Sequence, residues 1–550
     1  MKISIFALGG LNELGNNMYI VNVDDDIFIF DCGVKFAYED MLGVDYIHPD
    51  FSYLRKNKRN IKGLFISNIQ ASQMGGVADL VREIPSLKVY GSRLVTLLLK
   101  KDLSSLKLPT NNLIEIKPYK VINFGKQSIF PVSMTSSVPD SLAYALNTPS
   151  GYIFYSGDFT FDMGMKGFYK TDLGKLAYIG KQNVLCLMAE SFYADQKGYT
   201  APNNRTSSFI HEVFMHNKKR IIALVNMDQI YRIQEIMTEC IKSHKTLIIM
   251  GHNLQERVDF LLKTGYLKYE ESKIGSLNNL DDNNVVVLIS DENTKPFANL
   301  ERIIKGFDKY INLKADDTVF LTAPAELGTE KLRADIMDQI AEMNALVVAL
   351  PKKYLLHHAS TEDLRMIINL INPKYYFSVK GEYKDQVLNS EIALEEGILE
   401  NHIILKENGG IATFQNGKLL KAKKEEKEQV GTILIDGNRG KEVGDIVIQD
   451  REVLGESGIV IVNCLLSKKG KHIISGPDII AKGFVYIKDN QELLEVAKDK
   501  AKSIIENNIS SAKNYADYNN IKTEMRKELG NYFAAETGTR PLILIVTTEM

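Results

Sequence analysis

The stretch that decides the fold is Gly63-Leu64-Phe65-Ile66-Ser67-Asn68-Ile69-Gln70-Ala71-Ser72-Gln73-Met74-Gly75-Gly76. Its apolar run at 64–66 predicts a buried strand, and a polar loop follows before a helix-like segment at 77–84. A loop between a strand and a helix on a rigid scaffold is a common place for a functional site. This loop is unusual because Asn, Ser and Gln fill it and none of its side chains is ionisable.

Size and composition indicate a soluble globular protein with two to four domains. The 550 residues are 45% hydrophobic and 25% charged, and the net charge of −2 gives no overall basic field for nucleic acid, although a locally basic channel remains open. The four cysteines are far apart and are interpreted as buried free thiols rather than a disulfide set or a CxxC metal site. The first apolar segment, 3–8, is too short for a signal peptide, and no apolar run is long enough for a membrane span. We therefore expect a cytoplasmic protein without a membrane partner.

The frame of the loop, Leu-Phe-Ile-Ser followed by Met-Gly-Gly, resembles the signature of metallo-β-lactamase-fold hydrolases, and most closely that of ribonuclease J in the β-CASP group. That family carries His-x-His-x-Asp-His here. The resemblance implies two zinc ions about 3.5–4 Å apart that share a hydroxide able to attack phosphorus. In this sequence the four ligand positions hold Asn68, Gln70, Ser72 and Gln73. Neutral amides and a hydroxyl are poor zinc ligands.

The resemblance places three further metal-binding positions outside the loop, at Ser136, Asp158 and Lys380. Only Asp158 keeps the residue type that the family uses, so six of the seven positions are replaced. One carboxylate cannot hold a dinuclear centre, and we predict no metal or other cofactor, although the family uses zinc. A lone buried carboxylate is costly, and we therefore hypothesise that Lys380 forms an ion pair with Asp158. The alternative is a solvated lysine beside an unrelated loop.

Two more segments resemble functional parts of the family. Asp31 ends a predicted strand at 27–31, where the resemblance implies a residue that supports the metal ligands, while a turn-forming aspartate remains the alternative. The segment 354–360 resembles His-Val-Ser-Gly-His-Ala-Ser, which grips substrate phosphate and contributes a catalytic histidine. It gives the RNA- or phosphate-binding candidates Tyr354, Leu355, Leu356, His357, His358 and Ser360. A hydrogen-bonding or phosphate-contacting role is favoured over a metal site for the two histidines, because the sequence offers them no nearby acidic or cysteine partner.

Two further segments bear on ligand binding. The loop at 9–15 could be a dinucleotide fingerprint, but its spacing is wrong and hairpin turns explain it better. At Asp291 and Glu292 the chain carries acidic groups where the family has a glycine-rich loop, which argues against tight binding of an RNA 5′ end there.

The expected fold class is α/β. Helix–strand alternation over 204–352 predicts a parallel α/β insert. The resemblance implies a metallo-β-lactamase αββα sandwich formed by 1–203 and 353–448, with the β-CASP domain between them at 204–352. A strand is expected at 445–448, a linker at 449–455 and a small α/β oligomerisation domain at 456–550.

Three functions remain open. The first is a catalytically silent ribonuclease J-like subunit that contacts RNA and pairs with an active paralogue in RNA decay and rRNA or mRNA maturation, as a homo- or hetero-oligomer (dimer or tetramer). The second is an active exo- or endoribonuclease, for which the sequence reveals no rebuilt ligand set. The third is a stand-alone RNA-binding module that uses the cleft between the two larger domains.

Overall fold

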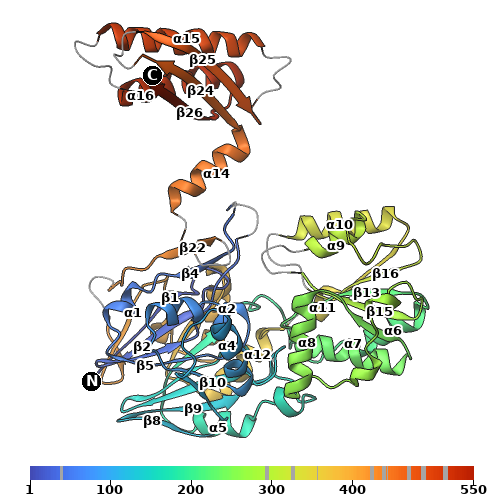
Figure 1. Ribbon diagram of the computed structural model, residues 1–550. Coiled ribbons are helices and arrows are strands. Elements are labelled where there is room, and N and C mark those ends of the chain that lie inside the picture. Colours follow the sequence, from blue (N-terminus) through green and yellow to red (C-terminus); the bar gives the residue numbers. More distant parts are fainter. Residues whose placement is uncertain are drawn as a thin grey trace. The chain divides into compact units, whose positions relative to one another are not determined.

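The computed structural model describes residues 1–37, 41, 43–291, 297–323, 329–355, 357–421, 426–436, 441–442, 444–467, 472–484, 491–511 and 518–549. The chain divides into two compact units, one formed by residues 1–38 and 45–440 and the other by 39–44 and 441–550. The first unit holds a two-sheet sandwich and an inserted α/β domain, and the second holds the C-terminal domain (Figure 1). This is the α/β class that the sequence predicted. Within the described residues no helix is long and apolar enough to cross a bilayer.

Two mixed sheets form the sandwich, and short hairpins open each of them. The first has the order β21-β20-β1-β2-β3-β5-β6-β7, with bounds Lys418–Leu419, Ala412–Gln415, Lys2–Gly9, Met18–Val23, Asp26–Phe30, Ile61–Phe65, Val89–Gly91 and Leu113–Glu115. The second has the order β19-β18-β12-β11-β10-β9-β8, with bounds Ile403–Ile404, Tyr375–Val379, Val184–Glu190, Gly151–Tyr155, Leu142–Thr148, Gln127–Ser133 and Ile122–Phe124. A further pair joins β4 (Tyr46–Pro49) to β22 (Thr432–Asp436).

The layers follow from where apolar side chains point. Strand residues alternate between the two faces of a sheet, so one set fills the space between the sheets. That central core is rich in aromatic rings, among them Phe28, Phe65 and Tyr144. Helices cover the outer faces, which gives the αββα sandwich. On the first sheet these include α1 (Ser52–Lys56), α2 (Ala71–Met74), α3 (Val77–Glu83) and α4 (Arg93–Ser105), and on the second α5 (Leu173–Gly180), α12 (Thr361–Ile371) and α13 (Tyr383–Glu395).

The inserted domain is a parallel sheet covered by helices on both faces. Its order is β14-β15-β13-β16-β17, with bounds Thr246–Ile249, Val285–Ile289, Ile221–Leu224, Thr318–Leu321 and Leu346–Ala349. All four pairings are parallel, and the central strands are buried, as expected for a sheet covered on both sides. Helices α9 (Ala298–Ile304) and α10 (Glu330–Glu342) lie on one face. The other face packs against α6 (Ser207–His216), α7 (Ile230–Lys242) and α8 (His252–Thr264) (Figure 1).

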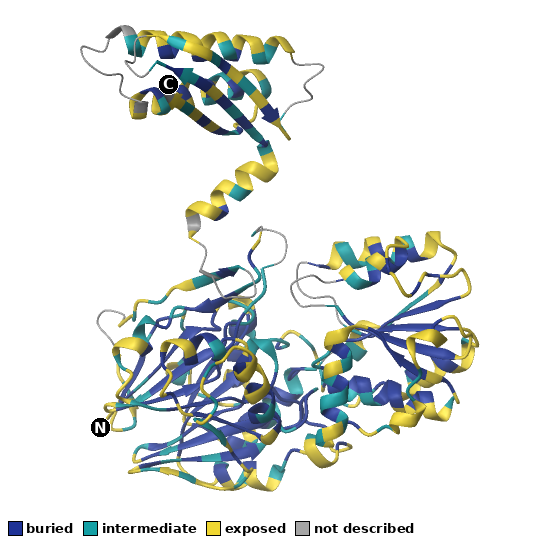
Figure 2. Cartoon of the chain, in the orientation of Figure 1, coloured by how far each residue is buried: buried dark blue, intermediate teal, exposed yellow. Residues whose placement is uncertain are grey.

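The C-terminal unit has its own small core. Its sheet has the order β25-β24-β26, with bounds Ile473–Lys482, Ile459–Leu466 and Leu542–Glu549, and one face packs against α15 (Gln491–Ser511) and α16 (Tyr518–Thr537). Buried residues gather between that sheet and its helices, while the outward helix faces are exposed (Figure 2).

The strand expected at 445–448 is wrong, because α14 (Asp445–Ser457) is helical there and includes the predicted linker at 449–455. Two predictions also lie outside the described residues, namely the role of Leu356 and the contribution of Glu292 to the acidic loop.

Candidate functional site

The site lies where three parallel strands of the second sheet end. Strands β11, β12 and β18 are neighbours and run in the same direction. Asp158 follows β11, Glu190 is the last residue of β12, and Lys380 follows β18. Because the carboxyl ends of adjacent parallel strands meet at one edge of a sheet, residues far apart in sequence converge there.

Asp158 is the centre of this group and is 2% exposed. The Lys380 ammonium donates to its Oδ1 atom, so the predicted ion pair is present. The other oxygen, Oδ2, accepts hydrogen bonds from Asn68 Nδ2 at 3.3 Å and Gln73 Nε2 at 2.9 Å. The two amides from the polar loop therefore present donors to the surviving carboxylate.

The backbone holds Lys380 in an unusual conformation. Its φ of 53° lies in the left-handed region, where residues other than glycine are uncommon. The Lys380 amide donates to Gly10 O at 3.0 Å, and its carbonyl accepts from Ser191 N at 2.9 Å. Strand ends on both sides thus direct the ammonium into a buried position, where the residue is 6% exposed.

The ionisation of Asp158 follows from these contacts. Burial alone would raise its pKa, but the charge of Lys380 and the hydrogen bonds to the carboxylate outweigh burial and lower the pKa below its ordinary value. Asp158 is therefore a carboxylate at neutral pH, with the ammonium as its counter-ion.

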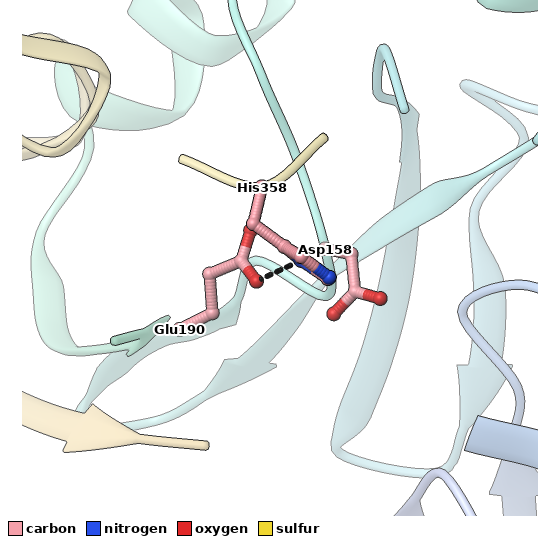
Figure 3. Close-up of side chains that lie close together, drawn as sticks. All are labelled: Asp158, Glu190 and His358. Carbon is pink, nitrogen blue, oxygen red and sulfur yellow. Dashed lines mark hydrogen bonds and ion pairs between the residues drawn. The ribbon is translucent and has the colours of Figure 1, made fainter. Parts of the chain in front are cut away.

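Glu190 is the functional residue that the sequence analysis missed. Its Oε1 accepts from Phe159 N at 2.8 Å and Ala359 N at 3.3 Å, and its Oε2 lies 2.7 Å from His358 Nδ1 (Figure 3). The expectation that the histidine pair has no acidic partner is therefore wrong. The available signal was a single glutamate closing the apolar run of β12.

Burial also controls the ionisation of Glu190 and His358. It raises the pKa of the Glu190 carboxyl to about 8, with the negative charge of Asp158 acting in the same direction. Burial, followed by the charge of Lys380, lowers the pKa of His358 to about 3. These shifts favour a protonated Glu190 beside a neutral His358, so that the Lys380 ammonium and the Asp158 carboxylate balance each other.

The remaining predicted metal positions face other partners. Ser136 Oγ lies 2.7 Å from Ser141 Oγ and accepts from Val138 N at 3.2 Å. Ser72 Oγ donates to Gln73 Oε1 at 2.6 Å, and the backbone amide of Gln70 donates to Asn68 Oδ1 at 2.8 Å. These bonds hold the loops together, and within the polar loop Asn68 and Gln73 are the residues that donate hydrogen bonds to Asp158.

Asp31 supports the loop that carries Asn68. It follows β3 in the facing sheet with a φ of 60° and accepts from Ser67 N at 2.7 Å, Ser67 Oγ at 2.8 Å and Tyr155 OH at 2.6 Å. Burial raises its pKa to about 7 despite these hydrogen bonds. The side chain thus links the two sheets directly behind the site.

Within the segment 354–360, His358 contacts the Glu190 carboxyl of this cluster, while other residues of the segment have different partners. His357 Nδ1 donates to Leu355 O at 2.9 Å, and Tyr354 O accepts from Arg232 Nη2 at 3.0 Å. Ser360 Oγ lies 2.7 Å from Thr200 Oγ1, at the N-terminus of α12. Leu355 and His357 line a cavity of about 30 Å³ that begins next to the cluster.

Comparison with known proteins places the chain in a family. One family model, described as Ribonuclease J, beta-CASP domain, matches residues 218–340, and another, Ribonuclease J C-terminal domain, matches residues 446–550. Ribonuclease J 2 of Staphylococcus epidermidis is 31% identical over 553 residues, which cover 100% of this chain and 98% of that protein. This chain belongs to the ribonuclease J family.

Two other similarities concern a second relative and a solved structure. Ribonuclease J 2 of Staphylococcus aureus is 30% identical over 100% of this chain and 98% of its own length. A solved protein of unknown function from Enterococcus faecalis superposes with a TM-score of 0.54 and 16% identity, covering 75% of this chain and 100% of that one. The second likeness concerns the fold alone. The resemblance inferred from the loop frame is confirmed.

The dinuclear zinc centre implied by the ribonuclease J resemblance does not fit these residues. Asp158, Glu190 and His358 offer ligand atoms within 4.8 Å of one another, which is a possible set for one ion in the described part of the chain. However, the Lys380 ammonium already contacts Asp158 and lies 3.8 Å from Glu190 Oε2. Two amide donors also face the carboxylate. A cation already occupies the position where metal charge would be needed.

Proposed function

We propose that this ribonuclease J-family chain is a catalytically silent subunit that contacts RNA. In this proposal it pairs with an active ribonuclease J paralogue in a cytoplasmic complex for RNA decay and maturation. The observation that carries the proposal is the buried Lys380–Asp158 ion pair, which replaces divalent charge by a tethered ammonium. Without a metal-bound hydroxide, the described residues of the site offer no activated nucleophile for attack on phosphorus.

The charge of the pocket supports this proposal. An ammonium balances a single carboxylate, and a protonated Glu190 leaves no further charge to neutralise. A divalent ion entering between Asp158 and Glu190 would meet Lys380 at close range, and like charges in a buried site repel strongly. Metal binding would therefore require Lys380 to leave its partner.

A second candidate is a hydrolase with one metal ion. The convergence of Asp158, Glu190 and His358 favours it, because three protein ligands are the usual number at a catalytic zinc site. Metal analysis of the purified chain separates the two candidates. The silent subunit should contain far less than one equivalent of zinc or manganese, and one or more equivalents bound at this group would favour the hydrolase.

The decisive experiment measures degradation of 5′-labelled RNA by this chain, by an active ribonuclease J paralogue, and by the two mixed. The chain alone should release no labelled product, and the mixture should differ from the paralogue alone in rate or product length. A mixed rate equal to that of the paralogue would remove support for a partnering role. A matched gain-of-function control restores the family ligands together in one variant: Asn68→His, Gln70→His, Ser72→Asp, Gln73→His, Ser136→His and Lys380→His.

A further inference from the structure

A small cavity lies beside the charged cluster, between the sandwich and the β-CASP domain. Its volume is about 30 Å³, and its walls include Thr160 from the sandwich and Asn204 and Arg232 from the inserted domain. Ligand pockets for whole small molecules are at least about ten times larger, at roughly 300–1,000 Å³. The cavity therefore has room for a group the size of a hydroxyl, not for a phosphate or a base.

The cavity wall is close to electrically neutral. Among the described residues of the wall, Arg232 is the formally charged one. It pairs through Nη1 with Glu235 Oε2 at 3.2 Å and donates through Nη2 to Tyr354 O at 3.0 Å. Arg232 is 8% exposed and Glu235 is 6% exposed, so this pair is shielded from solvent. Because the guanidinium charge is already compensated, the cavity favours a neutral polar group over an anion.

Three of the lining residues carry a buried polar atom without a hydrogen-bond partner among the described residues. They are Thr160 Oγ1, Asn204 Oδ1 and Arg232 Nε. Arg232 Nε can only donate, Asn204 Oδ1 can only accept, and the threonine hydroxyl can do either. Buried polar groups are nearly always paired in folded proteins. A matching group must therefore both donate and accept.

We propose that this cavity receives the 2′-hydroxyl of a ribonucleotide and thereby distinguishes RNA from DNA. A 2′-hydroxyl is small and neutral, it donates and accepts, and it is the group that tells RNA from DNA at a binding site. The position is suitable, since Thr160 lies two residues beyond Asp158 and His357 next to His358, so a ribose here would border the former reaction centre. This inference rests on the proposed RNA contact, and it adds that the contact selects RNA over DNA.

The test compares three 5′-fluorescent 12-nucleotide probes of one sequence, made as RNA, DNA and 2′-fluoro RNA, by fluorescence anisotropy with the full chain. The wild type should bind RNA more tightly than the other two probes, by roughly 3- to 10-fold, the value of one neutral hydrogen bond. Thr160→Val keeps the shape but removes the hydroxyl and should abolish the preference by weakening RNA binding alone. Thr160→Ser keeps the hydroxyl and should retain the preference.

Thermal unfolding of the same variants serves as the control for correct folding. The Thr160 amide still donates to Thr135 O at 2.8 Å after substitution, and the lost hydroxyl has no protein partner. Thr160→Val should therefore unfold at or above the wild-type temperature.

Several results would overturn the inference. They are equal affinity of the wild type for RNA and DNA, an equal loss for both probes in Thr160→Val, tight binding of 2′-fluoro RNA, or no binding of any probe. The first three would mean that the cavity holds water only, and the last would mean that no ribose reaches it. An absence of all binding would also contradict the proposed RNA contact, whereas the catalytic silence of the subunit is tested separately by metal analysis and by the mixing experiment.

Discussion

At the scale of single residues, the Lys380–Asp158 pair is the centre of the site. Removing one partner of a buried ion pair leaves the other charge uncompensated, at a typical cost of about 3–5 kcal/mol. We expect Lys380→Met to lower the free energy of unfolding of the first unit by about that amount, measured by urea denaturation. Lys384→Met is the control, because Lys384 pairs with Glu382 at 3.1 Å on an exposed surface, and such pairs contribute under about 1 kcal/mol.

Adding Asp158→Asn to Lys380→Met should recover much of the loss, since the double variant buries no charge. Equal stability of Lys380→Met and Lys384→Met would contradict the assignment of Lys380 as a buried counter-ion.

Glu190 makes stability depend on pH. Its pKa rises from an ordinary value of 4.5 to about 8 in the folded chain, so the folded state binds this proton more tightly than the unfolded state. The stabilisation is complete below about pH 4.5 and is lost as pH rises through about 8. Asp31 contributes with the same sign, but its pKa is raised only to about 7. The buried cysteine thiols, whose pKa values burial also raises, add to the loss as pH approaches 9, so the Glu190 contribution is isolated by comparing the wild type with a Glu190 variant.

Glu190→Gln should flatten the loss of unfolding free energy between pH 7 and 9. The glutamine carbonyl can still accept from Phe159 N and Ala359 N, and the amide stays neutral at every pH. Chemical denaturation at several pH values measures the slope, with the exposed Glu391→Gln as control. If Glu190→Gln keeps the wild-type slope, Glu190 is ionised in the folded protein.

The sequence identified most of this site but not its full membership. Asp158 and Lys380 were found because each stands in a recognisable frame, and the physics of a lone carboxylate predicted their pairing. Glu190 was missed because β12 is apolar up to its last residue, and nothing local marks a terminal glutamate as functional. His358 was found, but its acidic partner lies 168 positions away in sequence and became visible only through strand pairing.

At the scale of elements, the polar loop depends on a close approach between two backbones. A Cβ on Gly33 would come within 1.8 Å of Ser72 O and 2.9 Å of Asn17 N. Neither backbone can move freely, since Cys32 N donates to Gln73 O at 2.7 Å and Gly33 N to Asn17 O at 2.9 Å. The strand end after β3 and the loop after β5 are therefore fixed against each other.

Gly33→Ala should destabilise the first unit by about 3 kcal/mol or more, or prevent its folding, because overpacking against backbone cannot be relieved by a rotamer change. Gly125→Ala is the control. Gly125 has a φ of +68° and open space around it, so only the left-handed backbone cost of about 1–2 kcal/mol applies. Similar urea midpoints for the two variants would show that the loop can shift.

Two helices show the limits of the sequence analysis. It did not single out helix α8, although Leu254, Val258 and Leu261 are spaced for one buried face and Gly265 ends it with a φ of 83°. At 445–448 the sequence Asp-Ile-Val-Ile favours a strand by composition, yet α14 forms. The β-CASP strands were predicted correctly, because central parallel strands are short, uniformly apolar runs.

At the scale of the whole molecule, the C-terminal unit encloses its own core. Every member of that core comes from residues 460–545, including Val462, Ile505, Met525 and Phe533. We expect residues 441–550 expressed alone to fold and to unfold in one cooperative thermal transition, followed by circular dichroism. A fragment that binds a hydrophobic dye and melts without a transition would show that the first unit is needed for its folding.

The tethered ammonium of Lys380 makes the pocket independent of the metal supply of the cell. A side chain cannot dissociate or be removed by a chelator, so the integrity of the pocket is independent of metal scarcity in the cell. Metal binding by a restored ligand is also opposed, because any one ligand restored alone would meet Lys380 in place. Lys380 therefore opposes a stepwise recovery of the metal-ligand set.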